Sequence, residues 1–292
     1  MSTSDNGLPA GKLPQELLAR LLARLETDDP RVLGGAGVGE DAALIDFGDR
    51  VLIAKSDPVT FASDLIGWYA AHINANDVAC CGGDPRWFLA TVLLPVGVSE
   101  SAVEAIFNQL HDACHSLGVS MVGGHTEMTL DLPRPLISGT MLGEVPRGQE
   151  ITTSGARPGD RIILTKGIAI EGASILAREA AGRLRAAGVA QDTIDAAADL
   201  LFRPSISVVP DARAARSAGG VTAMHDPTEG GLAAALSELA AASGNGLMVE
   251  SEAVPVLPEA EAVCRALGAD PWGLIASGAL LITAAADAVP SI

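Results

Sequence analysis

An apolar segment from Ser63 to about Cys81 carries three polar side chains in its interior, Asn74, Asn76 and Asp77. Its length and composition predict a mostly buried helix. Burying two amides and a carboxylate is costly unless each is hydrogen-bonded or bound to an ion. One interpretation is a polar network that joins the helix to a loop. We favour a functional role, because a hydrophobic core gains nothing obvious from three such residues.

Three other segments place acids or glycines at the ends of apolar runs. Asp41 directly precedes the run 42–45, Asp57 follows the run 51–54, and the sequence Gly-Gly-His-Thr-Glu at 123–127 follows the run 119–122. Taken singly, each acid could be a turn or cap residue, and a Gly-Gly turn is a weak signal. Together with the helix they indicate a magnesium–polyphosphate site, since carboxylates hold a hard cation and bare N–H groups approach phosphate oxygens.

The composition limits the classes of partner. With 36 acidic and 19 basic residues the net charge is −17, which predicts binding to neither nucleic acid nor anionic membranes. Cysteines occur at four positions without CxxC spacing, and the adjacent Cys80 and Cys81 are typical of reduced core thiols. We see no signal peptide and no uncharged apolar stretch long enough to span a membrane. A reduced, cytoplasmic protein is therefore expected.

The apolar pattern predicts two lobes of mixed strands and helices, an α/β or α+β fold. We expect a mobile tail at 1–12, a first lobe at 13–147 and a second at 158–292, with the boundary between Pro146 and Pro158, where apolar periodicity is lost. In the first lobe we expect helices at 14–25, 63–81 and 99–117, and strands at 41–47, 50–55, 86–94, 119–122 and 136–145. In the second, strands at 161–165, 221–224, 246–250 and 279–283 are interleaved with alanine-rich helices.

Two segments of the second lobe leave a strand and open a helix. Lys166 and Gly167 form a natural anion site before the helix that begins near Ile170, although the spacing is not that of a Walker A loop. The sequence His-Asp-Pro-Thr-Glu-Gly-Gly at 225–231 precedes a second helix. Its threonine could merely cap that helix, but His225, Asp226 and two glycines exceed what a cap requires, so we favour a function.

Read in order, these segments resemble the superfamily of aminoimidazole ribonucleotide (AIR) synthetase, selenophosphate synthetase, thiamine-monophosphate kinase and the hydrogenase maturation protein HypE. The resemblance covers nearly all of residues 13–284. Four family patterns have counterparts in the first lobe. They are G-D-D-A at Gly39-Glu40-Asp41-Ala42, a second acidic segment at Ser56-Asp57, N-D-x-A…G-x-P from Asn76 to Pro85, and G-G-D-T at Gly123-Gly124-His125-Thr126. In the second lobe, residues 225–231 are similar to the HypE-type pattern H-D-x-T-x-G-G. Glutamate at position 40 and histidine at position 125 each replace an aspartate.

The resemblance implies a two-lobed PurM-like fold whose first lobe binds ATP and dimerises through its sheet, while the second closes over the site. By the same resemblance, Mg²⁺ is held by Asp41, Asp57 and Asp77. The implied nucleotide residues are Asn76, Gly123, Gly124, His125, Thr126 and Glu127. Those implied near a second substrate, a small molecule or carbamoyl-type group, are Lys166, His225 and Asp226.

Three functions are compatible with these residues. The first is a HypE-like enzyme that uses Mg²⁺ and ATP. HypE acts on a carbamoyl group carried on its own C-terminal cysteine, whereas this sequence ends in Pro290-Ser291-Ile292. We therefore expect either a truncated chain or a paralogue with another substrate. The second is a small-molecule kinase resembling thiamine-monophosphate kinase, and the third is a nucleotide-binding partner protein without turnover.

Overall fold

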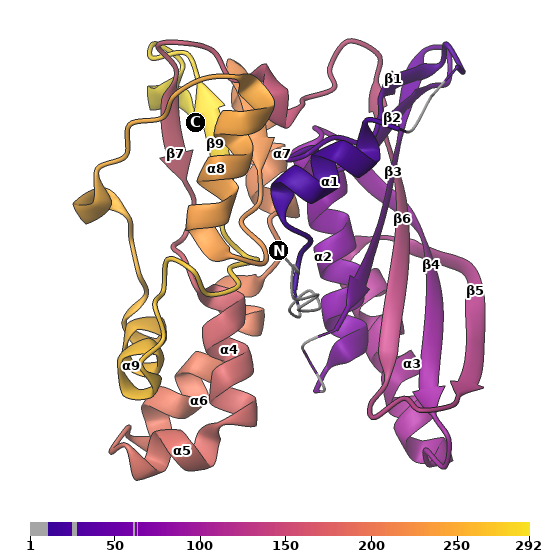
Figure 1. Cartoon of the computed structure of the whole chain (residues 1–292), viewed down its shortest axis with the longest axis vertical. Coiled ribbons are helices and arrows are strands. Elements are labelled where there is room, and N and C mark those ends of the chain that lie inside the picture. The colour runs from indigo at the N-terminus through magenta and orange to yellow at the C-terminus, as the bar shows by residue number, and fades with distance from the viewer. Residues whose placement is uncertain (1–10, 25–27, 61, 63) are drawn as a thin grey trace, which may run out of the picture.

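The computed structural model describes residues 11–24, 28–60, 62 and 64–292. The expected tail at 1–12 lies outside these residues except for Gly11 and Lys12. Two lobes of mixed strands and helices stand side by side, with α1 (Gln15–Leu22) beside the space between them (Figure 1). The predicted two-lobed α/β architecture is confirmed. Within the described ranges, no helix is long and apolar enough to cross a membrane.

The first lobe is built on a six-stranded sheet. Its strands are β1 (Val32–Gly34), β2 (Ala43–Asp46), β3 (Arg50–Val59), β4 (Asp84–Pro95), β5 (Ser120–Thr129) and β6 (Leu136–Pro146), in the order β1-β2-β3-β6-β4-β5. β4 and β5 run parallel, and the other pairs are antiparallel. Buried residues alternate along β6, which means that one face of the sheet is covered.

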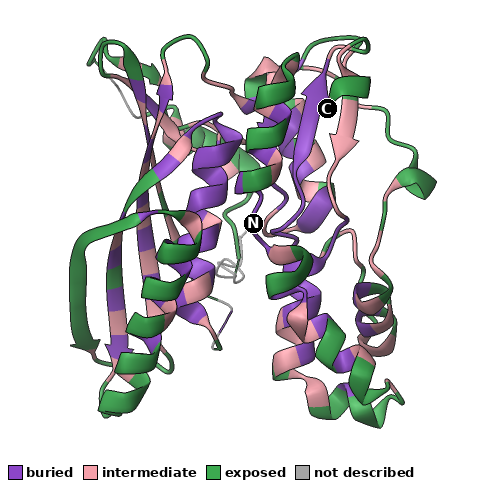
Figure 2. Cartoon of the chain, turned by 180° about the vertical axis from the view of Figure 1, so that it is seen from behind, coloured by how far each residue is buried: buried purple, intermediate pink, exposed green. Residues whose placement is uncertain are grey.

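Two helices cover that face. In α2 (Ile66–Cys80) nearly every residue is buried, and Figure 2 shows the helix in purple between the sheet and the second lobe. α3 (Glu100–Leu117) is amphipathic and packs on α2. The expected helix at 99–117 is confirmed: Ser99 caps its first turn by accepting the Ala102 N–H, and Gly118 ends it in the left-handed conformation.

The second lobe combines a small antiparallel sheet with several helices. The strands are β7 (Arg161–Leu164), β8 (Val221–His225) and β9 (Leu281–Ala284), in the order β7-β9-β8. The α-helices are α4 (Ile170–Glu179), α5 (Ala181–Ala186), α6 (Gln191–Asp199), α7 (Val209–Ala218), α8 (Gly231–Ser243) and α9 (Pro258–Leu267). α2 also contacts α7 and β8, so a single hydrophobic core extends from the first lobe into the second.

Two local predictions were wrong. The segment 246–250 forms no strand, because Met248 is 93% exposed and Val249 is also exposed, so there is no buried face for alternating side chains. The glycine pair expected to form a turn after 119–122 lies inside β5. Gly124 is opposite Ala90 of β4, with φ at +146°, and a Cβ there would lie 2.0 Å from the Ala90 carbonyl oxygen. Glycine at this position serves close strand pairing.

Candidate functional site

The three polar residues of α2 have three different environments. Asn74 secures the strand that carries Asp57: its Oδ1 accepts the Asp57 N–H at 2.9 Å, and its Nδ2 donates to the Asp57 carbonyl at 3.2 Å. Gly139 of β6 leaves room for this amide, since a Cβ there would lie 2.5 Å from Asn74 Nδ2. Asn74 thus fixes the backbone of an expected metal ligand.

Asn76 joins the two lobes. Its Nδ2 donates to the Ile206 carbonyl at 2.8 Å and its Oδ1 accepts the Val208 N–H at 2.9 Å. The side chain is fully buried, and both ends of the amide are bonded to backbone of the second lobe. The structure therefore places this residue, expected to contact nucleotide, at the junction between lobes.

Lys55 of β3 lies between two of the expected metal ligands. Its Nζ is 3.4 Å from an oxygen of Asp57 and 3.4 Å from Oδ1 of Asp77. Burial disfavours the charged lysine, but Asp77, Asp57, Asp41 and Asp226 together raise its pKa, so it stays protonated. The other Asp77 oxygen, Oδ2, is buried without a hydrogen-bond partner among the described residues. Burial raises the pKa of Asp77 although Lys55 opposes this.

Asp41 and His225 connect the lobes through a buried ion pair. His225 Nδ1 is 2.7 Å from Asp41 Oδ1, and Nε2 is 3.0 Å from Oε2 of Glu238 in α8. Burial disfavours the imidazolium, but the charge of Asp41 and the hydrogen bonds to both carboxylates outweigh it and raise the pKa of His225 to about 10. The ring is thus a cation at neutral pH. Lys12 adds a further ion pair to this group, with its Nζ 3.2 Å from Glu238 Oε1.

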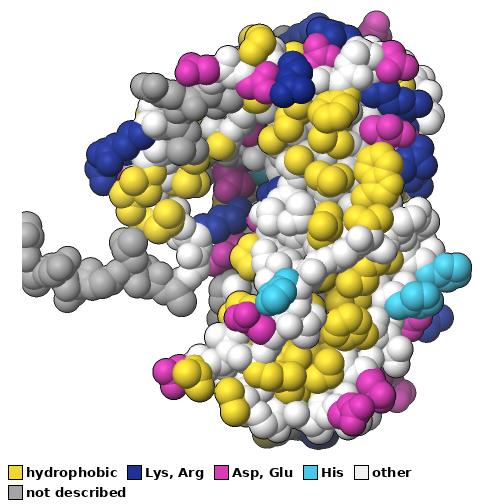
Figure 3. All heavy atoms as spheres, turned by 90° about the vertical axis from the view of Figure 1, so that its right-hand side faces the viewer, with side chains coloured by type: hydrophobic (Ala, Val, Ile, Leu, Met, Phe, Trp, Pro, Cys, Tyr) yellow, Lys and Arg dark blue, Asp and Glu magenta, His cyan; other side chains and the backbone are white. Residues whose placement is uncertain are grey.

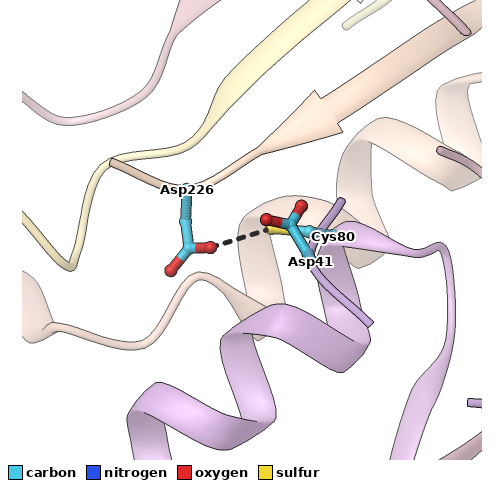
Figure 4. A group of neighbouring side chains, drawn as sticks. All are labelled: Asp41, Cys80 and Asp226. Atoms are coloured by element: carbon cyan, nitrogen blue, oxygen red, sulfur yellow. Dashed lines mark hydrogen bonds between the residues drawn. The ribbon is translucent and has the colours of Figure 1, made fainter. Parts of the chain in front are cut away.

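Asp226 follows β8 and faces α2. Its Oδ1 accepts a hydrogen bond from Cys80 Sγ at 3.5 Å, and ligand atoms of Asp41, Cys80 and Asp226 all lie within 4.8 Å of one another (Figure 4). Burial and the charge of Asp41 raise the pKa of Asp226 to about 6. Burial likewise raises the pKa of Cys80, so this core thiol acts here as a donor. Asp226 Oδ2 has no partner within the described chain.

Lys166 lies apart from this cluster. It adopts a positive φ between β7 and α4, and its Nζ donates to the Ser207 carbonyl at 2.7 Å and lies 3.1 Å from Asp211 Oδ2. The contacts of the ammonium group are therefore with the segment that leads into α7 and with the first turn of that helix.

The residues 123–127 lie at the opposite edge of the first sheet. β5 is three strand positions from β3, roughly 14 Å at the usual strand spacing. His125 and Glu127, paired with Thr91 and Leu93 of β4, are exposed and contact each other, with His125 Nε2 3.3 Å from Glu127 Oε2. Within one chain the structure does not bring them next to the Asp57–Asp77 group.

A cavity of about 550 Å³ opens between the lobes beside the cluster. Its lining includes Asp57 and Pro58 from the end of β3, Lys12, Thr228, Glu229, Glu171 and Ser277. Glu171, in the first turn of α4, is only 2% exposed, and burial raises its pKa to about 7 although it accepts the Ser277 N–H at 3.3 Å. Sequence reasoning missed this residue. The available signal was a lone acid among apolar and small residues at 168–176.

Most of the chain is similar to one known protein family. The sequence model described as AIR synthase related protein, N-terminal domain, matches residues 39–145, and that of the C-terminal domain matches 157–291. The chain belongs to the AIR synthase-related family. The carbamoyl dehydratase HypE of Cupriavidus necator is 32% identical over 295 residues, which cover 99% of this chain and 79% of that protein. The chain is thus a HypE-like member.

Solved structures show the same fold. A HypE in complex with ATP has a TM-score of 0.68 at 24% identity, covering 93% of this chain and 79% of that one. A ThiL protein complexed with AMPPCP and TMP has a TM-score of 0.73 at 22% identity, covering 94% and 84%. Both share the fold of this chain, and at these identities the likeness concerns the fold alone.

Proposed function

We propose that the chain is a cytoplasmic, Mg²⁺-dependent enzyme that uses ATP to activate or phosphorylate a small-molecule or carbamoyl-type substrate, as a HypE-like member of its family. The observation that carries this proposal is the group of four carboxylates around Lys55, next to an interlobe cavity. Carboxylates held by fixed backbone are suited to a hard cation, and a buried lysine to phosphate oxygens.

The residues fit a bound Mg²⁺. Asp77 Oδ2 and Asp226 Oδ2 are buried oxygens without partners in the described structure, and such groups are costly unless something satisfies them. Asp41, Asp57 and Asp77 would hold the metal, which when bound would neutralise charge on the ATP phosphates. Lys55 would contact a phosphate oxygen, and the Asp41–His225 pair would hold the second lobe over the site. We assign Asn76 and Lys166 a structural role.

We further propose a homodimer formed through the first sheet. The face of this sheet that α2 and α3 leave open carries a band of hydrophobic side chains (Figure 3). On β4, Trp87 precedes the buried Phe88 and is 38% exposed. β5 is exposed on both of its faces, including Val122 at 54% and Met128 at 56%. Large exposed apolar patches mark association sites. In the dimer, Gly123, Gly124, His125, Thr126 and Glu127 would approach the nucleotide across the interface.

Calorimetric titration of ATP with and without Mg²⁺ tests the proposed function. We expect Mg²⁺-dependent binding that is lost in Asp77→Asn, an isosteric change, and kept in the control Asp112→Asn, which alters an exposed acid of α3. Absence of binding by the folded wild type would overturn the proposal. ADP with free phosphate would indicate ATP-driven activation, a phosphorylated product a kinase, and binding without turnover a partner protein.

Sedimentation tests the dimer. Val122→Glu places a charge on the exposed strand and should shift a dimer to a folded monomer, because this residue is outside the core of the lobe. A wild-type chain that sediments as a monomer at micromolar concentration would contradict the proposed dimer.

A further inference from the structure

Glu171 is a buried carboxylate with too few partners for a purely structural role. It accepts one N–H, from Ser277 at 3.3 Å, whereas a carboxylate offers about four acceptor positions. Within the described residues, no lysine, arginine or histidine forms an ion pair with it. The first turn of α4 favours a negative charge there, but that effect is small compared with the cost of burying the charge.

Ser277, whose N–H bonds to Glu171, also has unused hydrogen-bonding capacity. Ser277 Oγ is buried next to the Glu171 carboxylate, with which it interacts, and it has no other hydrogen-bond partner among the described residues. Glu171 and Ser277 both line the interlobe cavity, and Ser277 belongs to the segment that precedes β9. A carboxylate with free acceptor positions and a hydroxyl whose neighbour within the described chain is that carboxylate therefore lie together at one wall.

The same cavity is lined from the other lobe by Asp57, which the proposed function gives to the metal. Lys12 and Thr228 line it as well. A small molecule in this cavity would thus lie between Asp57, the proposed metal ligand, and the Glu171–Ser277 pair. A second substrate in this cavity would therefore lie next to a nucleotide whose metal is held at Asp57, as phosphoryl transfer requires.

We propose that Glu171 is the proton acceptor for the second substrate, and that the Ser277 hydroxyl orients that substrate by a hydrogen bond. The inference rests on the proposed function and deepens it. The substrate class is a small polar molecule that carries an O–H or an amide N–H on, or next to, the oxygen that accepts the phosphoryl group.

The step balances in atoms and charge. The substrate oxygen forms a bond to the γ-phosphorus, while the bond from that phosphorus to the β,γ-bridging oxygen breaks and ADP leaves. The proton of the substrate O–H or N–H passes to a carboxylate oxygen of Glu171. A primary amide would leave this step as an O-phosphorylated imidate, and an alcohol as a phosphate ester.

Water is the smallest member of this substrate class and serves as the probe. Phosphate release from Mg²⁺-ATP should fall about 100-fold or more in Glu171→Gln, as is typical for loss of a general base. Affinity for the non-hydrolysable analogue AMPPCP should change less than twofold. The control Glu179→Gln changes an exposed acid at the other end of α4 and should keep the wild-type rate. Melting temperatures of all three proteins establish that they are folded.

The pH profile gives a readout that a structural role would not produce. The wild-type rate should rise with pH around 7, where Glu171 loses its proton, and this rise should be absent in Glu171→Gln. The ionisable groups around Glu171 are Tyr69 of α2, Asp226 after β8 and, on the cavity wall, Lys12, Asp57, Arg134 and Glu229. Comparing the two profiles separates Glu171 from these groups, since all of them remain in the variant.

The outcomes distinguish the inference from the function on which it rests. AMPPCP binding together with rates that do not differ between wild type and Glu171→Gln would overturn the inference alone. Loss of AMPPCP binding in Glu171→Gln would also overturn it, because the residue would then hold nucleotide. Failure of the wild type to bind nucleotide would overturn the proposed function and, with it, the inference.

Discussion

Replacing His225 by alanine should destabilise the protein strongly at neutral pH. The ring lies between Asp41 and Glu238, at 2.7 and 3.0 Å, and all three residues are buried. Its removal leaves two buried carboxylates facing each other without the cation that separates them. Removing one partner of a buried ion pair costs about 3–5 kcal/mol. The pKa of His225 gives a similar figure: a rise from 6.5 to about 10 corresponds to an upper value of about 5 kcal/mol.

The sign of the pH dependence follows from the direction of this pKa. Because the pKa is higher in the folded state than in the unfolded state, the stabilisation is complete below pH 6.5 and is lost as pH rises toward 10. Urea unfolding of wild type and His225→Ala at pH 6, 7, 8 and 9 measures the difference between their free energies of unfolding. Above pH 6.5 that difference should shrink by up to about 1.4 kcal/mol per pH unit.

His111→Ala is the matched control, because its side chain is 80% exposed on α3 and its ring contacts the exposed residues Asp112 and His115. It should change the free energy of unfolding by less than about 0.5 kcal/mol at every pH. A wild-type-minus-variant difference for His225→Ala that is below 1 kcal/mol, or that stays constant from pH 6 to 9, would refute a charged His225 between the lobes.

Two further substitutions probe the polar residues of α2. Asn76→Ala leaves the Ile206 carbonyl and the Val208 N–H buried and unpaired, which at about 1–3 kcal/mol each should lower the free energy of unfolding by about 2–6 kcal/mol. The exposed Asn108→Ala is its control, and equal urea midpoints for the two variants would contradict the proposed link. Gly139→Ala forces a Cβ to within 2.5 Å of Asn74 Nδ2, so we expect a loss of about 1–3 kcal/mol together with weaker Mg²⁺-ATP binding. Gly246→Ala, with no atom within 4 Å of the added carbon, should match wild type in melting temperature and calorimetry.

The importance of the α2 polar residues could be predicted from the sequence because the cost of burying them is local. Their partners could not, since Asn76 bonds to backbone 130 residues away, and no pattern in the chain encodes that contact. Glu171 escaped notice because an acid in the first turn of a helix is usually explained by the helix dipole. The glycine pair of β5 was misread since Gly-Gly is common in turns, whereas here Gly124 permits contact with Ala90. Whether the remaining predicted ligands bind metal or nucleotide stays a prediction.

The position of α2 has a consequence for how the chain unfolds. This helix lies in the core of the first lobe, and yet Asn76 completes the backbone hydrogen bonds of the second. Neither lobe can lose its structure without uncovering apolar surface and unpaired polar groups of the other. We therefore expect one cooperative denaturation transition, with a denaturant m value set by the surface that both lobes expose on unfolding together. The second lobe expressed alone should lack a stable native state.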